Sequence, residues 1–423
     1  MNEKIINNPN SKKHICFVSV GHISSNPRLV KEATLAAQKG YNVSIVGVQT
    51  LEKLVSFDEE LIEKNPNWNV FIYPFYQKKG LYFLGTFFHH FAKRLPKLAN
   101  QSILGKLSIS TPLWFPIYHY LKSIKADLYI VHNITMLPLV VKIAKKNNAK
   151  IGLDIEDAYA VMSEGIDENI VDIEKKYLSQ LDYLTCASPL YVDFYNKHYQ
   201  NLPTITPILN VFEDVEEQEK KEYKDRKNTN NLSLYWFSQT TGKGRGIEQI
   251  IEALNVLDRS DIELHLRGIV SQETKEYFLS LVKSETIKKN IFFHPLVSNQ
   301  ELASRTAEHD IGLALELKEP LNRDLCLTNK IFQYLNTGLA ILASNTTAQK
   351  FIMEENPQVG FLINIENAQE VAQKIEILAN SKKNTTDELE NMKIASKNLS
   401  KTKYNWDIEG QKFLEVIKDC LEK

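Results

Sequence analysis

Residues 14–48 read HICFVSVGHISSNPRLVKEATLAAQKGYNVSIVGV and contain the unit that decides the fold. The run 14–20 is apolar and rich in β-branched side chains, which is typical of a buried strand. A polar turn leads into 28–40, where apolar residues recur at helical spacing before a closing glycine. A second apolar run follows at 42–48. Strand, helix and strand in this order predict a parallel sheet with helices on both faces.

The same alternation continues along the 423 residues, and the length favours two domains of roughly 200 residues each. Further strands are predicted at 127–132, 150–156, 182–187, 232–238, 262–268, 291–296, 310–317 and 339–344. Helices are predicted at 135–147, 167–180, 246–257, 272–284 and 329–338. We therefore expect two doubly wound α/β domains. The charged stretch 213–231 between them is interpreted as a solvated loop.

The composition is typical of a soluble globular protein, with 43% hydrophobic and 24% charged residues. The sequence has no run of about 18 apolar residues, and its N-terminal apolar stretch is too short for a signal peptide. The four cysteines are too widely spaced to indicate a zinc site or a disulfide framework. We expect a cytoplasmic protein. Because 51 Lys and Arg balance 52 Asp and Glu, the net charge gives no reason to expect nucleic acid as a partner.

Ligands of doubly wound sheets bind beyond the carboxyl ends of the strands, so the loops after the strands are the candidate sites. The loop after the first strand lacks the G-x-G-x-x-G pattern, which argues against a dehydrogenase, and no P-loop sequence occurs. Gly242-Lys243-Gly244-Arg245-Gly246 stands between a predicted strand and its helix. Backbone N–H groups, a helix N-terminus and two cations there would hold a diphosphate. A simple flexible turn is the alternative.

A second loop brings Thr328, Asn329 and Lys330 to the start of a predicted helix. A lysine in the first turn opposes the helix dipole, and an anion bound between the helix terminus and Lys330 would explain its presence. The alternative is an ordinary N-cap with the lysine reaching solvent.

His132 closes an apolar strand, a position that points a near-neutral titrating group toward a ligand. The adjacent strand ends in Asp154, Glu156 and Asp157. These carboxylates could orient His132, bind substrate hydroxyls or cap the next helix. A structural role for His132 is the alternative.

Five stretches resemble family 4 glycosyltransferases and follow one another in that family's order: 25–33, 131–157, 207–213, 237–254 and 328–344. The resemblance implies the GT-B fold, in which two Rossmann-like domains face each other across a cleft. It assigns acceptor binding to 1–203 and nucleotide-sugar binding to 204–403. The final helix, 404–423, is expected to return to the first domain.

The resemblance also implies a reaction. A sugar would pass from a nucleotide diphosphate sugar to a glycan or lipid-linked acceptor with retention of configuration, without a metal or another cofactor. The implied catalytic residues are His132, Arg245 and Lys330. Arg245 and Lys330 would stabilise the departing diphosphate, and the acceptor hydroxyl would attack from the front face.

The remaining implied site residues fall into two groups. Those on the donor side are Gln239, Gly244, Gly246, Thr328, Asn329, Gln333, Glu316 and Glu319. Those on the acceptor side are Gly21, His22, Glu156 and Asp157. Two glutamates found in many family members are replaced here by Leu325 and Gln333. Gln333 can still hydrogen-bond a ribose hydroxyl, and Glu316 or Glu319 could replace the missing carboxylate.

The segment 64–126 contains no Asp or Glu among its 63 residues, while it holds nine Lys and Arg and 14 aromatic residues. Cations with interfacial aromatics predict binding to an anionic membrane surface, which would make the protein peripheral on the inner face. Two alternatives are that the aromatics are core and that the bases attract a soluble anionic acceptor. Single-stranded RNA would also suit this composition, but no RNA-binding motif supports it.

These observations predict a retaining glycosyltransferase in surface polysaccharide or glycolipid synthesis. The alternative is a non-catalytic glycosyltransferase-like subunit that binds a nucleotide sugar or a partner enzyme, and it is suggested by Leu325 and Gln333. A sugar-nucleotide epimerase is disfavoured because nothing beyond His132 offers a clear acid–base pair.

Overall fold

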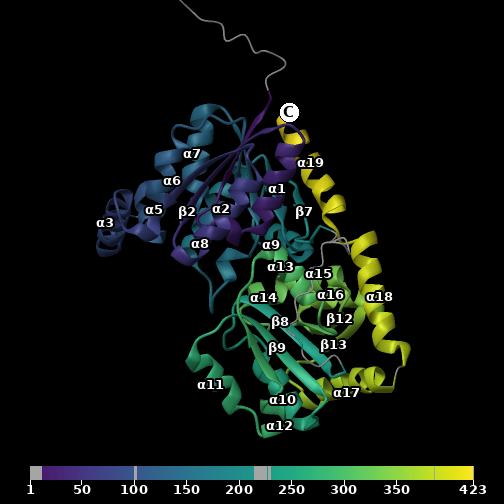
Figure 1. The fold of residues 1–423 in the computed structure, drawn as a ribbon. Helices are drawn as coiled ribbons and strands as arrows, with labels where there is room; N and C mark the ends of the chain where they lie inside the picture. Colours follow the sequence, from purple (N-terminus) through teal and green to yellow (C-terminus); the bar gives the residue numbers. More distant parts are fainter. Residues whose placement is uncertain (1–11, 100–101, 214–225, 227–229, 385, 423) are drawn as a thin grey trace, which may run out of the picture. The chain divides into compact units, whose positions relative to one another are not determined.

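The computed structural model describes residues 12–99, 102–213, 226, 230–384 and 386–422, and these form two compact units (Figure 1). The first unit takes in 166–208 together with the described residues of 1–160 and 410–423. The second takes in 161–165 and the described residues of 209–409. Most of the charged stretch 213–231 lies outside the described residues.

The first unit is built on a seven-stranded sheet in the order β3-β2-β1-β4-β5-β6-β7, in which every pairing is parallel. Its strands are β1 (His14–Val18), β2 (Asn42–Gln49), β3 (Trp68–Pro74), β4 (Leu128–Val131), β5 (Lys150–Ile155), β6 (Tyr183–Cys186) and β7 (Ile205–Pro207). The central strand β1 is buried along almost its whole length, as its continuous apolar run predicts.

Helices connect the strands of this sheet. They are α1 (Pro27–Gln38), α2 (Val55–Lys64), α3 (Leu81–Arg94), α4 (Pro96–Ala99), α5 (Ile103–Ser110), α6 (Trp114–Leu121), α7 (Leu137–Asn147), α8 (Glu168–Tyr177) and α9 (Pro189–His198). Short 3-10 turns lie at η1 (Ile23–Ser25), η2 (Glu52–Leu54), η3 (Phe75–Gln77), η4 (Ile134–Met136), η5 (Tyr159–Val161) and η6 (Leu178–Gln180). Asn26 caps α1 by accepting a hydrogen bond from the Leu29 N–H, and Pro27 opens the helix.

The second unit holds a six-stranded parallel sheet in the order β10-β9-β8-β11-β12-β13. Its strands are β8 (Leu232–Thr240), β9 (Ile262–Ile269), β10 (Ile291–His294), β11 (Ile311–Ala314), β12 (Ala340–Ser344) and β13 (Gly360–Ile363). Its helices are α10 (Ile247–Leu257), α11 (Gln272–Ser280), α12 (Glu285–Lys288), α13 (Asn299–Thr306), α14 (Leu321–Leu325), α15 (Asn329–Thr337), α16 (Thr347–Glu355), η8 (Pro357–Val359), α17 (Ala368–Asn384) and α18 (Asp387–Thr402). The last helix, α19 (Trp406–Glu422), starts in this unit, and its residues from Gly410 belong to the first.

The prediction of two parallel α/β sheets is confirmed. Three strands were missed, β3, β7 and β13, and all three are edge strands. An edge strand pairs on one side and is less buried, so it lacks the continuous apolar run that marks a central parallel strand. The predicted helix 272–284 is also too long, since α11 ends at Ser280 and a separate short helix follows.

Candidate functional site

The glycine loop after β8 has two residues in a backbone conformation that favours glycine. Gly244 and Gly246 have φ angles of +69° and +83°, in the left-handed region. A Cβ atom on Gly246 would lie 2.7 Å from the side chain of Ile365 and 2.9 Å from that of Leu315. The Gly244 N–H donates to the Glu248 carboxylate at 2.8 Å, and the Gly244 carbonyl accepts from Arg323 at 2.8 Å. The loop is therefore a fixed structure at the N-terminus of α10.

Arg245 is the cation of this loop that remains available. It is half-buried, two residues before α10 begins, and it makes no hydrogen bond or ion pair with another described residue. Lys243 instead places its ammonium 4.1 Å from the centre of the Tyr277 ring. Gln239 is exposed near the end of β8. Arg245 thus combines a free guanidinium with the positive end of a helix dipole, the arrangement that binds phosphate.

Lys330 and Glu316 form a buried ion pair, with Nζ 2.9 Å from Oε1. The Glu316 backbone N–H donates to Ser344 Oγ, which donates in turn to the Glu316 carbonyl, so the segment after β11 is fixed to β12. The carboxylate of Glu316 compensates the lysine in the first turn of α15. The sequence suggested a bound anion beside Lys330 as one explanation, and in the structure the carboxylate of Glu316 lies there, while Glu319 is exposed.

Two buried polar atoms, one at the N-cap of α15 and one within the helix, lack a hydrogen-bond partner among the described residues. They are Oγ1 of Thr328, the N-cap residue, and Nε2 of Gln333. Leaving such a group unsatisfied costs about 1–3 kcal/mol, so atoms of this kind indicate where a ligand hydroxyl would bind. Asn329 is already engaged, because its Oδ1 accepts from Asn210 at 2.6 Å. Leu325, at the end of α14, offers no polar group.

In the first unit, the structure brings His132, Glu156 and Asp154 together beyond the ends of β4 and β5. The His132 ring is fully buried, with Nδ1 3.1 Å from Glu156 and 3.5 Å from Asp154. Its Nε2 lies 3.4 Å from a carboxylate that sequence reasoning missed, Glu32 of α1. Burial alone would lower the pKa of His132, but the nearby carboxylates of Asp154, Glu156 and Glu32 raise it above its ordinary value of 6.5. The carboxylates therefore favour the protonated imidazolium, the form that donates hydrogen bonds.

A second missed residue, Arg28 of α1, completes this network. Its guanidinium donates two hydrogen bonds of 2.6 Å to the two oxygens of Asp154, and Thr185 donates a third to the same carboxylate. Burial would raise the pKa of Asp154, but Arg28 and His132 hold it well below its ordinary value. Arg28 and Glu32 lie on the apolar face of α1 beside Leu29, so charged residues within an apolar stripe were the signal in the sequence.

The same network bears on metal binding. Ligand atoms of His132, Asp154 and Glu156 lie within 4.8 Å of one another, which would suit a cation. However, both oxygens of Asp154 already accept hydrogen bonds from the guanidinium of Arg28, and one of them accepts a further bond from Thr185. The donor set is therefore that of an internal ion network and does not fit a metal.

His22 is engaged entirely within the first unit. Its Nε2 accepts hydrogen bonds from the N–H groups of Thr50 and Leu51, so this nitrogen carries no proton. Its Nδ1–H donates to Asp58 at 2.7 Å. Both ring nitrogens already make hydrogen bonds within the protein, so neither is available to bind an acceptor substrate. Gly21, just after β1, has open space where a side chain would project, and Asp157 is half-buried after β5.

The network makes stability depend on pH through His132. Because the folded-state pKa is raised, the contribution of His132 is fully present below pH 6.5 and is lost as the pH rises through the folded-state pKa. His132→Gln is therefore expected to lower the free energy of unfolding more at pH 6 than at pH 9. Urea unfolding followed by hydrogen exchange in β4 measures this difference. The exposed His119→Gln serves as control, and an equal loss at both pH values would show that His132 is neutral in the folded protein.

No family model and no curated protein matches the sequence of this chain. Solved structures do match its fold. A glycosyltransferase from Rickettsia africae has a TM-score of 0.69 at 14% identity and covers 98% of this chain and 100% of that one. Sucrose-phosphate synthase from Thermosynechococcus elongatus has a TM-score of 0.67 at 13% identity, with 96% and 99% covered.

A third structure is HepE from Anabaena in complex with UDP-glucose, with a TM-score of 0.66 at 12% identity and 96% and 99% covered. These likenesses extend over nearly the full length of each chain, and at such identities they establish the fold. The chain has the GT-B fold, with two Rossmann-like domains, as the sequence predicts.

Proposed function

We propose that this protein is a glycosyltransferase that takes its sugar from a nucleotide diphosphate sugar. The observation that carries the proposal is the glycine loop before α10 with the unpartnered guanidinium of Arg245. Strands β8 and β11 are parallel neighbours, so the Arg245 loop and the Glu316 segment leave the sheet at the same edge. HepE, which shares the fold, is known in complex with UDP-glucose, and this supports a donor of that class.

The chemistry follows from where charge develops. Cleavage of the sugar–phosphate bond leaves negative charge on the diphosphate, and Arg245, Lys330 and the N-termini of α10 and α15 stabilise it. Lys330 is held in place by Glu316, so it meets the leaving group without reorganisation. Thr328 and Gln333 offer their unsatisfied groups to donor hydroxyls. These cations perform the role without a metal.

We further propose retention of configuration. The acceptor hydroxyl attacks from the face that the diphosphate leaves, and the leaving phosphate takes its proton. His132 fits this scheme as a positioned hydrogen-bond donor, because three carboxylates surround its ring and favour its protonated form. On the acceptor side, Glu156 and Asp157 remain the candidates for binding hydroxyls, because His22 is engaged within its unit.

Donor binding and donor hydrolysis test this function. UDP-, GDP- and ADP-sugars are added to the purified protein, and one of them is expected to raise the unfolding temperature, because a ligand stabilises the folded state that binds it. The same sugar should be hydrolysed slowly without acceptor. Binding without hydrolysis would favour the non-catalytic subunit, for which the apolar Leu325 is the supporting observation. An absence of both would refute the proposal.

The acceptor side points to a surface polysaccharide or glycolipid made at a membrane. No helix among the described residues is long and apolar enough to cross a bilayer. The segment 64–126 nevertheless combines nine cations with exposed aromatics such as Phe83 and Phe87, which are 63% and 62% exposed. We therefore propose peripheral attachment through this segment.

The protein is expected to sediment with anionic liposomes at low salt and to be released at high salt, because exposed cations are screened. Replacing Lys93, Arg94 and Lys97 together with glutamine should abolish sedimentation. The same change at the exposed Lys350, Lys401 and Lys418 should leave it intact. Failure of the unmodified protein to sediment would refute membrane attachment.

A further inference from the structure

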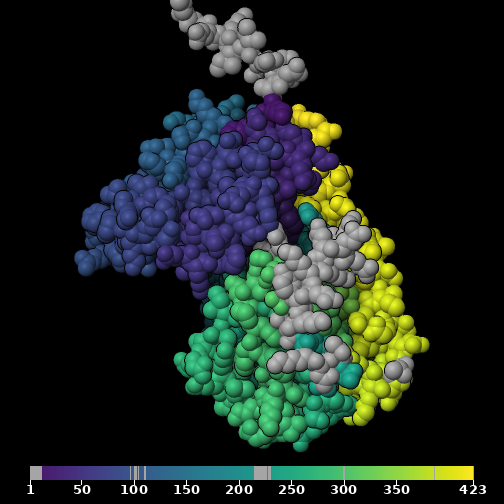
Figure 2. Space-filling model, in the orientation of Figure 1, coloured from purple at the N-terminus to yellow at the C-terminus, as the bar shows by residue number. Residues whose placement is uncertain are grey.

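The helices α3 to α6 form an apolar lobe of the first unit. Half of the large apolar side chains that are exposed in the described residues lie between 83 and 118. Figure 2 shows this part of the chain, in blue and violet, as a projection on the left side of its unit. Some aromatic residues of segment 64–126 belong to the core and others to the surface. Trp114 is buried, while Phe83, Phe87 and Phe91 face solvent.

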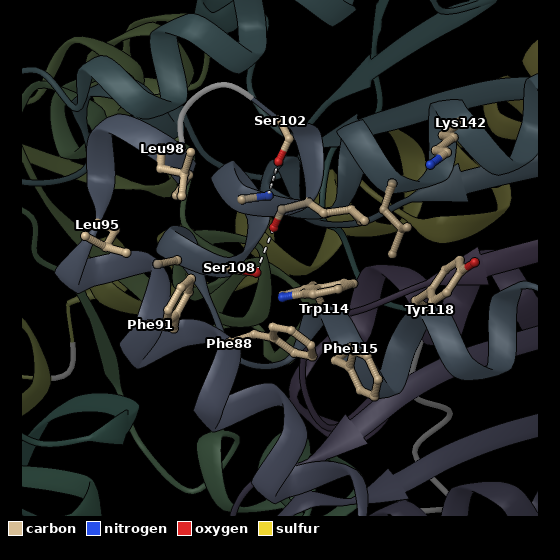
Figure 3. Close-up of a pocket in the computed structure, with 15 residues that line it drawn as sticks. Phe88, Phe91, Leu95, Leu98, Ser102, Ser108, Trp114, Phe115, Tyr118 and Lys142 are labelled. Carbon is tan, nitrogen blue, oxygen red and sulfur yellow. Dashed lines mark hydrogen bonds between the residues drawn. The ribbon is translucent and has the colours of Figure 1, made fainter.

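The lobe contains a pocket of about 410 Å³, within the roughly 300–1,000 Å³ range of small-molecule sites. Its lining is contributed by α3 to α7: Phe88, Phe91, Ala92, Leu95, Leu98, Ala99, Ser102, Leu104, Gly105, Ser108, Trp114, Phe115, Tyr118, Leu139 and Lys142. Figure 3 shows leucines at one end of this pocket, the aromatic rings along it and Lys142 at the other end.

Most polar groups of the pocket wall are already used within the lobe. Ser102 Oγ accepts from the Gly105 N–H, and Ser108 Oγ donates to the Leu104 carbonyl. Two groups remain. The buried indole N–H of Trp114 has no hydrogen-bond partner among the described residues, and the ammonium of Lys142 is exposed and makes no ion pair there. A ligand that matches this wall is apolar over most of its length and can place a hydrogen-bond acceptor at Trp114 and an anionic group at Lys142.

The pocket is joined to the candidate site of the same unit by a short stretch of chain. His132 is followed by η4 and then by α7, whose Leu139 and Lys142 line the pocket. Along α7 from Leu137 to Lys142 the distance is about 7.5 Å, at 1.5 Å per residue. In addition, α5 packs against both η4 and α7. A molecule in the pocket would thus reach toward the sheet edge at which His132 lies.

We propose that this pocket binds the hydrocarbon chain of a single-chain, phosphate-bearing lipid, with the phosphate at Lys142, and that this lipid carries the acceptor. The inference rests on the proposed function and specifies its acceptor. A hydrocarbon chain needs no hydrogen bonds, whereas a peptide would bring amides that this wall cannot satisfy. The acid-free segment of the lobe supplies charge complementarity to an anionic headgroup.

Alkyl phosphates are the probes for a test on the full-length protein. Octyl, decyl and dodecyl phosphate are titrated below their micelle concentrations, with inorganic phosphate and dodecyl maltoside for comparison. Affinity is expected to rise by about fourfold for each added methylene until the pocket is full. Trp114 fluorescence reports binding, and Trp114→Phe should lose the signal while calorimetry still detects the ligand.

Matched variants locate the binding. Leu98→Glu, at a pocket residue that is 58% exposed, should weaken dodecyl phosphate binding at least tenfold. Ile394→Glu on α18, at a residue that is 57% exposed, should leave it unchanged. Lys142→Gln should weaken binding of the phosphate while sparing the neutral maltoside.

The outcomes separate this inference from the proposed function. If a nucleotide sugar binds and alkyl phosphates do not, the lipid pocket is refuted and the glycosyltransferase proposal stands. If alkyl phosphates bind as expected and no nucleotide sugar does, the lipid pocket stands, while its role in holding the acceptor falls together with the glycosyltransferase proposal. The pocket would also be refuted if the affinity for alkyl phosphates did not depend on chain length. An equal loss of dodecyl phosphate affinity in Leu98→Glu and Ile394→Glu would refute it too. So would concentration-dependent self-association that Leu98→Glu abolishes, since it would assign the lobe to a second copy.

Discussion

Arg245→Ala is expected to lower sugar transfer by a factor of about 100 or more, the cost of removing a group that stabilises charge developing in the transition state. Its stability should remain close to that of the unmodified protein, because Arg245 has no partner among the described residues whose charge would be left uncompensated. Turnover of the nucleotide sugar identified by thermal shift measures the loss, and the unfolding temperature measures stability.

A control variant with the same change of charge is Lys350→Ala, at an exposed lysine whose ion pair is with Glu354. It should retain turnover. Lys330→Ala should also lose transfer by a factor of about 100, but it would lose stability as well, because Glu316 would stay buried without its partner. Turnover of Arg245→Ala equal to that of Lys350→Ala would remove Arg245 from the site.

The central part of the fold could be predicted from the sequence because its signals are local. Strands β1 and β8 are continuous apolar runs, and α15 ends at Gly338, which adopts the left-handed conformation of a C-cap. The glycines of the loop before α10 could also be recognised in the sequence, and in the structure two of them have a positive φ. Three of the four edge strands, β3, β7 and β13, could not be predicted, because their burial depends on pairing that the local sequence does not encode.

The candidate sites were less predictable, because their geometry comes from residues far apart in the chain. Arg28 and Asp154 are separated by 126 positions, and no spacing rule links them. Position also gave no indication that His22 faces backbone N–H groups and Asp58. For Lys330 the sequence suggested a bound anion as one of two explanations, and the structure places the carboxylate of Glu316 beside it, a residue that was expected on the donor side for another reason.

Arg28→Ala is expected to lower the free energy of unfolding of the first unit by about 3–5 kcal/mol, the cost of removing one partner from a buried ion pair. Three carboxylates, those of Glu32, Asp154 and Glu156, would then face His132 as their remaining cation. Hydrogen exchange in β4 and β5 during urea unfolding measures the loss of stability in this unit. A single unfolding curve would combine the stabilities of the two units.

Lys13→Ala is the matched control, because Lys13 pairs with Asp127 at 3.3 Å while both side chains are largely exposed. Its cost should stay below about 1 kcal/mol, as for other surface pairs. The loss in Arg28→Ala should also shrink as the pH falls below about 4. The pKa of Asp154 is held well below its ordinary value by Arg28 and His132, so this carboxylate stabilises the fold above its unfolded-state pKa, and without Arg28 it can take up a proton instead. A loss no larger than that of Lys13→Ala would mean that the network does not hold the sheet edge together, and His132 would then lack the fixed position that its proposed role requires.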